Sequence, residues 1–269
     1  SVLGAPLDSS RNLVTRGKQT PIDVTSASSF RIWVGEDGEV VELDGSTIPV
    51  SWREAASALS QIGDGTAVVI GGADTGKTTL CTFLANSLTR EGTRVGVVDA
   101  DIGQTDLGPP TTMAAGEVTR PVLSLTQVQA SERLFIGLTS PGRLKNKVIQ
   151  SVRRLVGYHK KPGELVIVNT DGWVSGTEAA AYKLQMLDEV KPDITLGIGE
   201  RDETSRILQA GRCATLLVGS PDVIKERTRA DRRELRTLSY QKYLAGASAK
   251  TIRLDHVTVQ DAVSLNRLN

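Results

Sequence analysis

The sequence predicts an α/β fold with a doubly wound, mostly parallel sheet, and three observations lead to this prediction. Beyond Asp64, short apolar runs recur that are continuous rather than alternating, which is typical of parallel strands covered on both faces. Segments with helical spacing separate these runs, as in βαβ units. A glycine-rich turn follows the first run, where a parallel strand would lead into a helix.

The elements of this core follow in order along the chain. The apolar runs predict strands, namely AVVI at 67–70, VGVV at 95–98, LFIGL at 134–138, LVIV at 165–168, ITLGI at 194–198 and TLLVG at 215–219. Helical spacing predicts helices, namely 53–62, 78–90, 144–156, 177–189, 203–210 and a basic segment within 221–243. We therefore expect the core to span 63–220, and an arginine-rich lid with a C-terminal β-containing segment to span 221–269.

The chain before the core has a different character. Residues 1–20 are polar with scattered Gly and Pro, so we expect a flexible or loosely attached arm. In 21–62, β-prone pieces alternate with Gly and Asp turn signals, which predicts a small antiparallel meander before the first helix. Trp33 and Trp52 are expected to form the core of that meander.

Composition excludes several classes of protein. The chain has 269 residues, 39% hydrophobic and 23% charged, which fits one large domain with a small appendage. Its net charge of +1 excludes a globally basic, non-specific nucleic-acid binder. Cys81 and Cys213 lie far apart, so neither a disulfide framework nor a zinc site is expected.

The same features predict where the protein works. The cysteine usage fits a reducing cytoplasm, and no apolar run approaches the roughly 20 residues of a membrane helix. We therefore expect a soluble, intracellular protein without a membrane partner. Because the chain begins at Ser1 and not with Met, we expect that it was trimmed or processed.

The strongest motif is Gly71–Thr78, which fits G-x-x-x-x-G-K-[ST] between a strand and a helix. Glycines let backbone N–H groups turn toward a polyphosphate, and the helix N-terminus adds partial positive charge. This predicts a P-loop NTPase in which Lys77 reaches the β- and γ-phosphates and the Thr78 hydroxyl binds Mg²⁺. The nucleotide-binding residues are expected to be Gly72, Ala73, Asp74, Thr75, Gly76, Lys77, Thr78 and Thr79.

Two carboxylates follow the second predicted strand. Asp99 and Asp101 lie at its carboxyl end, and the alternation of side chains places both on the same side. One would hold the metal, directly or through water, and the other would orient or deprotonate a hydroxyl nucleophile. The alternative for a single Asp at this place is a helix cap. The predicted metal ligands are therefore Thr78, Asp99 and Asp101.

The choice of nucleotide can also be predicted. Switch-type GTPases read guanine through N-K-x-D, but 146–149 has Ile at the last position and 169–171 lacks the Lys. Guanine is therefore disfavoured, and ATP is the expected nucleotide.

Two further features point to a nucleic-acid substrate. Trp173 follows Gly172 at the end of a strand, where it would stack on a base; the alternative is packing under the next helix. The stretch 141–161 holds seven Lys or Arg residues and no acidic residue, and 225–236 is rich in arginine. Such runs are either solvated helix faces or contacts for a phosphate backbone and a transferring phosphoryl group.

Together these residues resemble the polynucleotide 5′-hydroxyl-kinase family, which includes the RNA kinase of the pre-mRNA cleavage factor, the nucleolar pre-ribosomal-RNA kinase and archaeal relatives. Four elements carry the resemblance: the GGADTGKT loop, DADIGQ at 99–104, the T-x-G-W "clasp" at 170–173 and the arginine lid at 226–236. The segments 139–141 and 199–201 also look like parts of the family pattern. The resemblance covers roughly 64–243.

The resemblance implies ATP-dependent phosphorylation of the 5′-hydroxyl end of RNA or DNA. Asp101 would be the base or aligner of that hydroxyl, and Gln104 would assist it. Arg232, and secondarily Arg227, would neutralise the phosphoryl group. The end being phosphorylated would be held by the clasp, whose residues are Thr170, Asp171, Gly172 and Trp173.

Two alternatives remain beside this enzyme. One is a catalytically inactive ATP-binding scaffold of an RNA-processing complex, which would not need to keep Lys77, Asp101 and Arg232 together. The other is a P-loop ATPase acting on a small molecule or in metal delivery, which usually has His or Cys ligands. The sequence predicts no particular protein partner and does not distinguish RNA from DNA.

Overall fold

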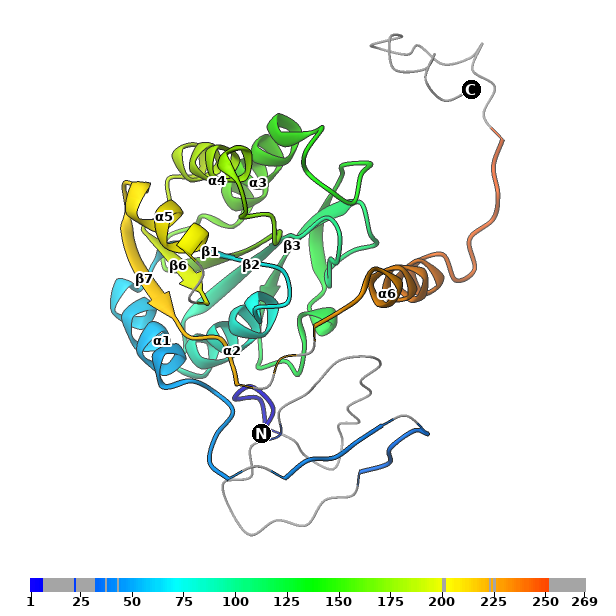
Figure 1. The fold of residues 1–269 in the computed structure, drawn as a ribbon, viewed down its shortest axis with the longest axis horizontal. Coiled ribbons are helices and arrows are strands. Elements are labelled where there is room, and N and C mark those ends of the chain that lie inside the picture. Colours follow the sequence, from blue (N-terminus) through cyan, green and yellow to red (C-terminus); the bar gives the residue numbers. More distant parts are fainter. Residues whose placement is uncertain are drawn as a thin grey trace.

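The computed structural model describes residues 1–6, 22, 32–36, 38–42, 44–199, 202–222, 224 and 226–251. Within them a single seven-stranded sheet runs in the order β4-β3-β2-β5-β1-β6-β7 (Figure 1). The strands are β1 (Gly65–Gly71), β2 (Arg94–Ala100), β3 (Thr112–Val118), β4 (Ala130–Phe135), β5 (Glu164–Thr170), β6 (Ile194–Ile198) and β7 (Ala214–Val218). The helices are α1 (Val50–Ile62), α2 (Lys77–Arg90), α3 (Lys145–His159), α4 (Thr177–Val190), α5 (Asp202–Ala210) and α6 (Arg229–Tyr243).

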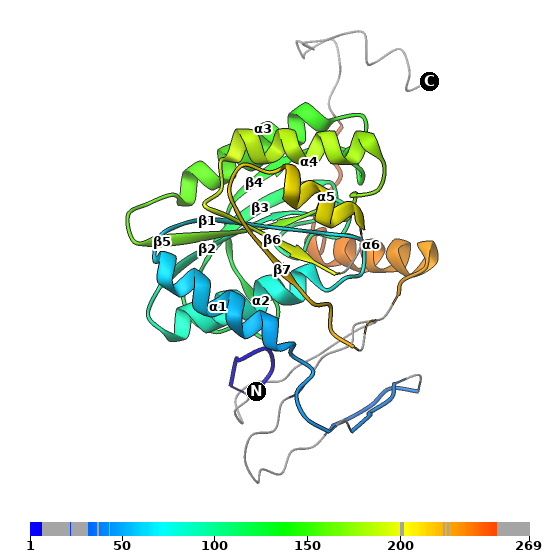
Figure 2. The ribbon, with the colours of Figure 1, turned by 60° about the vertical axis from the view of Figure 1, so that its left-hand side comes forward.

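Helices cover both faces of the sheet (Figure 2). α1 and α2 pack on one face, and α3, α4 and α5 pack on the other. Two apolar clusters fill the spaces between the layers, because successive residues of a strand point to opposite faces. Val97, for example, belongs to the cluster under α2, whereas Val98 belongs to the cluster under α3. The predicted doubly wound sheet is thereby confirmed.

Five of the strands pair in parallel, and the remaining two form antiparallel pairs at one edge of the sheet. β1, β2, β5, β6 and β7 pair in parallel, whereas β3 pairs antiparallel with both β2 and β4. The sequence did not indicate β3, because its Ala- and Gly-rich TMAAGEV text is not a continuous apolar run. The strand expected at 134–138 is displaced: β4 ends at Phe135, and its burial alternates as in an edge strand with one covered face.

The structure describes only part of the segment in which the N-terminal meander is predicted. Residues 32–36, 38–42 and 44–49 contain no strand, although Gly38 N–H donates to the Gly35 carbonyl at 2.9 Å in the predicted turn. Trp33 is 84% exposed, and Trp52 lies in α1, where it packs on Phe83 of α2. Trp52 therefore belongs to the α/β core. Much of the predicted meander lies outside the described residues.

The prediction of a loosely attached arm at 1–20 is wrong for its first six residues. Val2 and Ala5 are buried in the same cluster as α1 and α2, and the Asn86 side-chain amide donates to the Leu3 carbonyl at 2.8 Å. The first six residues thus pack on the core, while residues 7–20 lie outside the described part of the chain. The C-terminal β-like piece at 251–259 also lies outside it, apart from Thr251.

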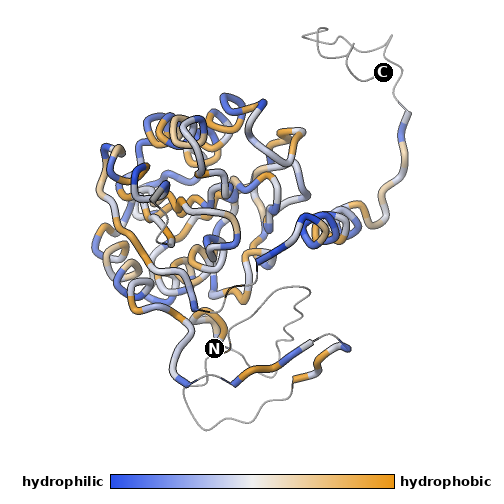
Figure 3. The backbone as a smooth tube through the Cα atoms, viewed as in Figure 1, coloured by the Kyte–Doolittle hydropathy of each residue, from blue (hydrophilic) through white to orange (hydrophobic). Residues whose placement is uncertain are grey.

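The basic segment expected within 221–243 is helical only from Arg229. Thr228 and Asp231 form a capping box there, in which each side chain accepts a hydrogen bond from the other's backbone N–H. α6 lies beside the sheet rather than on it, and none of its residues is buried (Figure 1). Hydrophilic residues dominate this helix (Figure 3). In the part of the chain that the structure describes, no helix has the length and apolar character needed to cross a membrane.

Candidate active site

The loop from Gly71 to Lys77 joins β1 to α2 at the carboxyl edge of the sheet. Gly76 has φ of +96°, in the left-handed region that favours glycine, and Lys77 is the first residue of α2. The strand, loop and helix thus follow one another as predicted, and the N-terminus of α2 points partial positive charge into the loop.

Lys77 is buried inside this loop. Its Nζ donates a hydrogen bond to the Gly72 carbonyl at 2.6 Å. Burial lowers the pKa of Lys77, and the negative charge of Asp101 opposes that effect. The ammonium group therefore lies near Asp101 as well as near the backbone of its own loop.

Asp101 follows β2 directly, across from Lys77. Its Oδ1 accepts from the backbone N–H groups of Gly103 and Gln104, both at 3.1 Å, so a tight turn holds the carboxylate. Burial raises the pKa of Asp101, and Lys77 is the strongest charge acting against that increase. Lys77 and Asp101 are therefore close enough for their charges to interact, and Gln104 lies in the same turn as Asp101.

Asp99 is fully buried beneath this turn. Its Oδ2 accepts from the Thr105 hydroxyl at 2.9 Å and from the Asp106 backbone N–H at 2.6 Å. Burial, followed by the charges of Asp106 and Asp101, raises the pKa of Asp99 to about 7. Asp99 thus ties the loop after β2 to the strand.

Asn169 is a site residue that sequence reasoning missed. Its Nδ2 donates to the Thr78 hydroxyl at 3.2 Å and to Asp99 Oδ1 at 3.0 Å, while its Oδ1 is buried without a hydrogen-bond partner. Asn169 pairs in register with Asp99 on the neighbouring strand, so its place at a strand end was a usable signal. An unsatisfied buried oxygen next to a threonine hydroxyl is an arrangement that suits a hard cation.

The described residues contain no group of three or more His, Cys, Asp and Glu side chains that could hold a metal. A metal cage made entirely by those side chains is therefore absent from them. Oxygen ligands from Thr78 and Asn169 fit Mg²⁺, which commonly uses one or two protein oxygens together with phosphate oxygens.

The clasp at 170–173 packs directly against the phosphate-binding loop. A Cβ placed on Gly172 would lie 2.7 Å from the Ala73 nitrogen, so only glycine permits this approach. The Thr170 hydroxyl donates to the Val69 carbonyl of β1 at 2.8 Å. The two motifs, about 100 residues apart in the chain, are therefore in contact.

A buried ion pair supports the clasp from α4. Asp171 Oδ2 accepts from the Tyr182 hydroxyl at 2.8 Å and lies 3.0 Å from Lys183 Nζ, while its Oδ1 accepts from the Trp173 N–H at 3.0 Å. The Trp173 ring stacks on Tyr182 with centroids 5.6 Å apart. Trp173 thus packs with one side on α4, as the alternative interpretation expected. Tyr182 and Lys183 were not predicted as site residues.

The lid (226–243) reaches the same loop through its arginines. The Arg227 backbone N–H donates to Asp74 Oδ2 at 3.0 Å, its guanidinium lies 3.2 Å from Oδ1, and the Arg232 guanidinium also contacts Oδ2. Arg227 Nε is buried without a hydrogen-bond partner. Asp74 was predicted only as a phosphate-loop residue, and the structure adds an acidic anchor for both lid arginines.

The basic side chains of 141–161 lie in two different environments. Lys145 forms an ion pair with Glu178 at 2.5 Å, and Arg153 forms one with Glu189 at 3.3 Å. These two residues fit the alternative interpretation, in which the basic stretch is a solvated helix face. Lys147 instead donates to the Ile136 carbonyl at 3.0 Å and lies over the Phe135 ring. Lys225, Glu200 and Arg201 lie outside the described residues.

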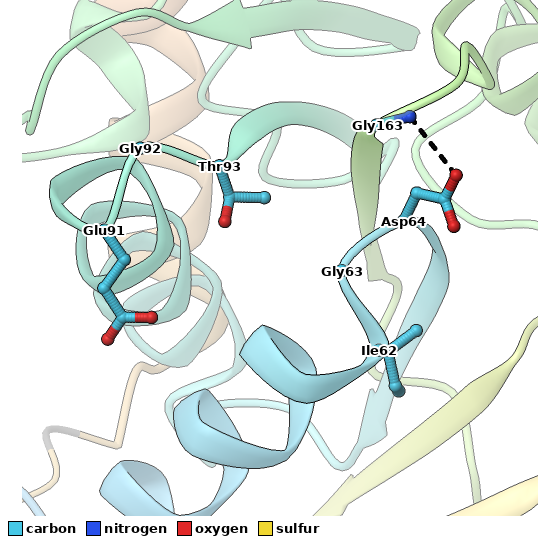
Figure 4. Close-up of a pocket in the computed structure, with 7 residues that line it drawn as sticks. All are labelled: Ile62, Gly63, Asp64, Glu91, Gly92, Thr93 and Gly163. Atoms are coloured by element: carbon cyan, nitrogen blue, oxygen red, sulfur yellow. Dashed lines mark hydrogen bonds between the residues drawn. The ribbon is translucent and has the colours of Figure 1, made fainter.

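A shallow pocket lies at the opposite edge of the sheet, where β1, β2 and β5 begin (Figure 4). Asp64 and Glu91 line it, and Asp64 accepts from the Gly163 N–H at 3.2 Å. None of the predicted site residues lines this pocket, and ligands of open α/β sheets bind at the carboxyl edge instead.

The glycine-rich loop after the interior strand β1, with its buried lysine and Asp101 nearby, makes this chain a nucleotide-binding protein of the P-loop class. Comparison with known proteins narrows the class. The family model described as "mRNA cleavage and polyadenylation factor CLP1 P-loop" matches residues 71–246, and the chain belongs to that family. The resemblance found in the sequence is thereby confirmed.

The relatives that this chain matches carry kinase names. A protein of Pyrococcus abyssi named polyribonucleotide 5′-hydroxyl-kinase is 32% identical over 71% of this chain and 54% of its own length. The polyribonucleotide 5′-hydroxyl-kinase Clp1 of Danio rerio is 32% identical over 66% of this chain and 43% of its own length. The chain thus spans about half the length of the curated relatives it matches.

A solved structure agrees on the fold. Clp1p in its complex with Pcf11p residues 454–563 superposes with a TM-score of 0.59 at 16% identity, over 75% of this chain and 55% of that one. At this identity the likeness concerns the fold alone.

Proposed function

We propose that this protein is an ATP-dependent polynucleotide 5′-hydroxyl kinase that transfers the γ-phosphate of ATP to the 5′-hydroxyl end of RNA or DNA. The observation that carries this proposal is the contact of three motifs around one point. Asp101 lies close enough to Lys77 for their charges to interact, the clasp packs on Ala73, and the lid arginines contact Asp74. The names of the relatives favour RNA as the acceptor.

Lys77 and the loop residues from Gly72 to Thr79 would bind the triphosphate. Lys77 is held by a single carbonyl, that of Gly72, and by the field of Asp101, so phosphate oxygens can replace that carbonyl as acceptors. The backbone N–H groups at the start of α2 would contact the phosphates beside Lys77.

Asp101 would orient the 5′-hydroxyl and accept its proton. The hydrogen bonds from Gly103 and Gln104 occupy Oδ1 only, which leaves Oδ2 for the incoming hydroxyl. Since phosphoryl transfer needs little covalent chemistry from the protein, positioning is the main contribution of this carboxylate.

Mg²⁺ would be held by the Thr78 hydroxyl, with Asn169 Oδ1 and Asp101 as the neighbouring oxygens. Asp99 would act through Asn169, whose amide it orients. When bound, Mg²⁺ would neutralise phosphate charge.

The lid arginines would neutralise the transferring phosphoryl group. Arg232 and Arg227 both contact the Asp74 carboxylate, so a phosphate in the loop would compete with that carboxylate for both guanidinium groups. We also propose 63–220 as the kinase core and 221–269 as the segment that carries the lid.

The decisive test is transfer of labelled γ-phosphate to a 5′-hydroxyl RNA oligonucleotide, beside a 5′-phosphorylated copy and a DNA copy. Lys77→Ala, Asp101→Asn and Arg232→Ala should each lower turnover by about 10²-fold or more. Arg236→Ala, a lid residue without a role in the proposal, serves as the control. Wild-type protein that labels no 5′-hydroxyl end would contradict the proposal and favour the inactive scaffold. ATP turnover without any effect of nucleic acid would favour the small-molecule ATPase.

A further inference from the structure

The edge strand β4 presents an exposed aromatic side chain next to the candidate active site. Phe135, its last residue, is 70% exposed, and Leu138 in the following loop is 40% exposed. β4 runs in the same direction as β2, because each is antiparallel to β3, so Phe135 and Asp101 share the carboxyl edge of the sheet. The proposed function does not use either apolar side chain.

The loop after β4 touches the turn that holds Asp101. A Cβ placed on Gly103 would lie 2.9 Å from the Thr139 carbonyl oxygen. The loop after β4 and the turn that holds Asp101 are therefore neighbours at this edge of the sheet.

One basic side chain lies over the Phe135 ring, and another shares the exposed face of its strand. Lys147 Nζ lies 5.8 Å from the ring centroid and is held there by its hydrogen bond to the Ile136 carbonyl. Arg133 is two residues earlier on the exposed face of β4. Within the described part of the chain, no carboxylate forms a salt bridge with Lys147, Arg133 or Arg143. The ion pairs of this region involve Lys145 and Arg153 instead.

The end of α6 carries a half-buried aromatic, Tyr243, close enough to Arg133 of β4 for their charges to interact. Burial raises the pKa of Tyr243, and the nearby Arg133 is the strongest charge opposing that increase. Lys242 Nζ lies 5.3 Å from the Tyr243 ring centroid. Exposed aromatic rings interleaved with cations are the features by which proteins hold single-stranded nucleic acid without reading its sequence.

Building on the proposed function, we propose that the single-stranded polynucleotide downstream of the 5′ end crosses this surface. A base beyond the second nucleotide stacks on Phe135, while Lys147 and Arg133 contact the backbone phosphates. The surface favours this occupant, because an exposed aromatic side chain with Lys147 over its ring and Arg133 on the same strand face suits a polyanion with flat bases. These side chains are too few for a stable protein interface, which buries about 1,200 Å² or more.

The test compares a 5′-hydroxyl dinucleotide, too short to reach β4, with a 12-residue single strand, each as RNA and as DNA. Phe135→Ala should raise the KM for the 12-mer roughly tenfold, since one stacked base contributes that much or more. The kcat and the KM for the dinucleotide should not change. Phe135→Trp should restore the KM, whereas Phe135→Leu should not. A plot of the logarithm of the association constant for the 12-mer against the logarithm of the salt concentration has a negative slope. Lys147→Gln should make this slope shallower by roughly 0.7.

Leu217→Ala is the matched control, since Leu217 is 46% exposed on β7, at the other edge of the sheet. A fluorescence-anisotropy Kd for the labelled 12-mer, measured with the same variants, does not depend on turnover. Unchanged KM and Kd in Phe135→Ala, with wild-type protein that labels both substrates, would overturn the inference and leave the kinase proposal intact. An equal loss on dinucleotide and 12-mer would also overturn it, because the effect would then lie at Asp101. Wild-type protein that labels neither substrate would instead contradict the proposed kinase.

Discussion

At the residue scale, the active-site proposal depends on side chains that share one network of hydrogen bonds. Thr78, Asn169 and Asp99 come from three separate elements, and the Asn169 amide joins the other two. The amide is oriented by both acceptors, which leaves its oxygen free for a ligand. Asn169 therefore lies where it could bind a cation through Oδ1 and also orient the Thr78 hydroxyl as a neighbouring ligand.

Replacing Asn169 should therefore weaken the affinity of the ATP-bound protein for Mg²⁺. Asn169→Ala should raise the Mg²⁺ concentration for half-maximal ATP binding about tenfold, as other residues that support metal ligands do. Calorimetric titration of ATP at a series of Mg²⁺ concentrations measures this shift. Asn146→Ala, an exposed asparagine of α3, is the control. An unchanged Mg²⁺ requirement would show that Asn169 is not part of the metal site.

At the scale of the element, α4 determines where the clasp lies. Lys183 is fully buried and bonds both the carboxylate and the carbonyl of Asp171, and Tyr182 bonds the same carboxylate while its ring supports Trp173. Burial lowers the pKa of Lys183, and Asp171 opposes that decrease. The two ions are thus mutually dependent, because each would be costly to bury alone.

This dependence predicts how variants of the pair behave. Lys183→Met should destabilise the protein by about 3 kcal/mol, since it leaves the Asp171 carboxylate buried without its cation. The double variant Asp171→Asn with Lys183→Met should recover much of that loss. Urea denaturation of the two single variants and the double variant measures both effects. A double variant no more stable than Lys183→Met would contradict the interpretation of this pair as a buried ion pair.

At the scale of the whole molecule, segments distant in sequence complete one core. Val2 and Ala5 enter the cluster beneath α1 and α2, and Asn86 joins Leu3 to Val122 through hydrogen bonds at 2.8 Å. The beginning of the chain therefore stabilises the same layer that carries the phosphate-binding loop.

Val2→Ala should accordingly lower the free energy of unfolding by about 1.5 kcal/mol, the value of the buried methyl groups that it removes. Val41→Ala, at a position that is 61% exposed, should change it by less than about 0.5 kcal/mol. Chemical denaturation monitored by circular dichroism measures both. Equal values for the two variants would show that the first residues do not contribute to the core.

The sequence by itself determined the parallel core and the phosphate-binding loop, because both depend on local patterns. Continuous apolar runs and the spacing of Gly76, Lys77 and Thr78 are readable without knowing any neighbour. The same holds for Asp101 at a strand end. The motifs of the clasp and the lid could also be identified in the sequence, although the residues that they contact could not.

Only the tertiary structure decided which distant groups meet. Trp33 is exposed, whereas Trp52 is buried beside Phe83. Whether another element covers each ring is set by tertiary packing, which strand propensity does not describe. β3 was missed because its Ala and Gly residues gain their burial from neighbouring strands. Asn169, Lys183 and the Asp74 anchor of the lid arginines are likewise products of long-range packing, since their partners lie 70, 12 and up to 158 residues away in the chain.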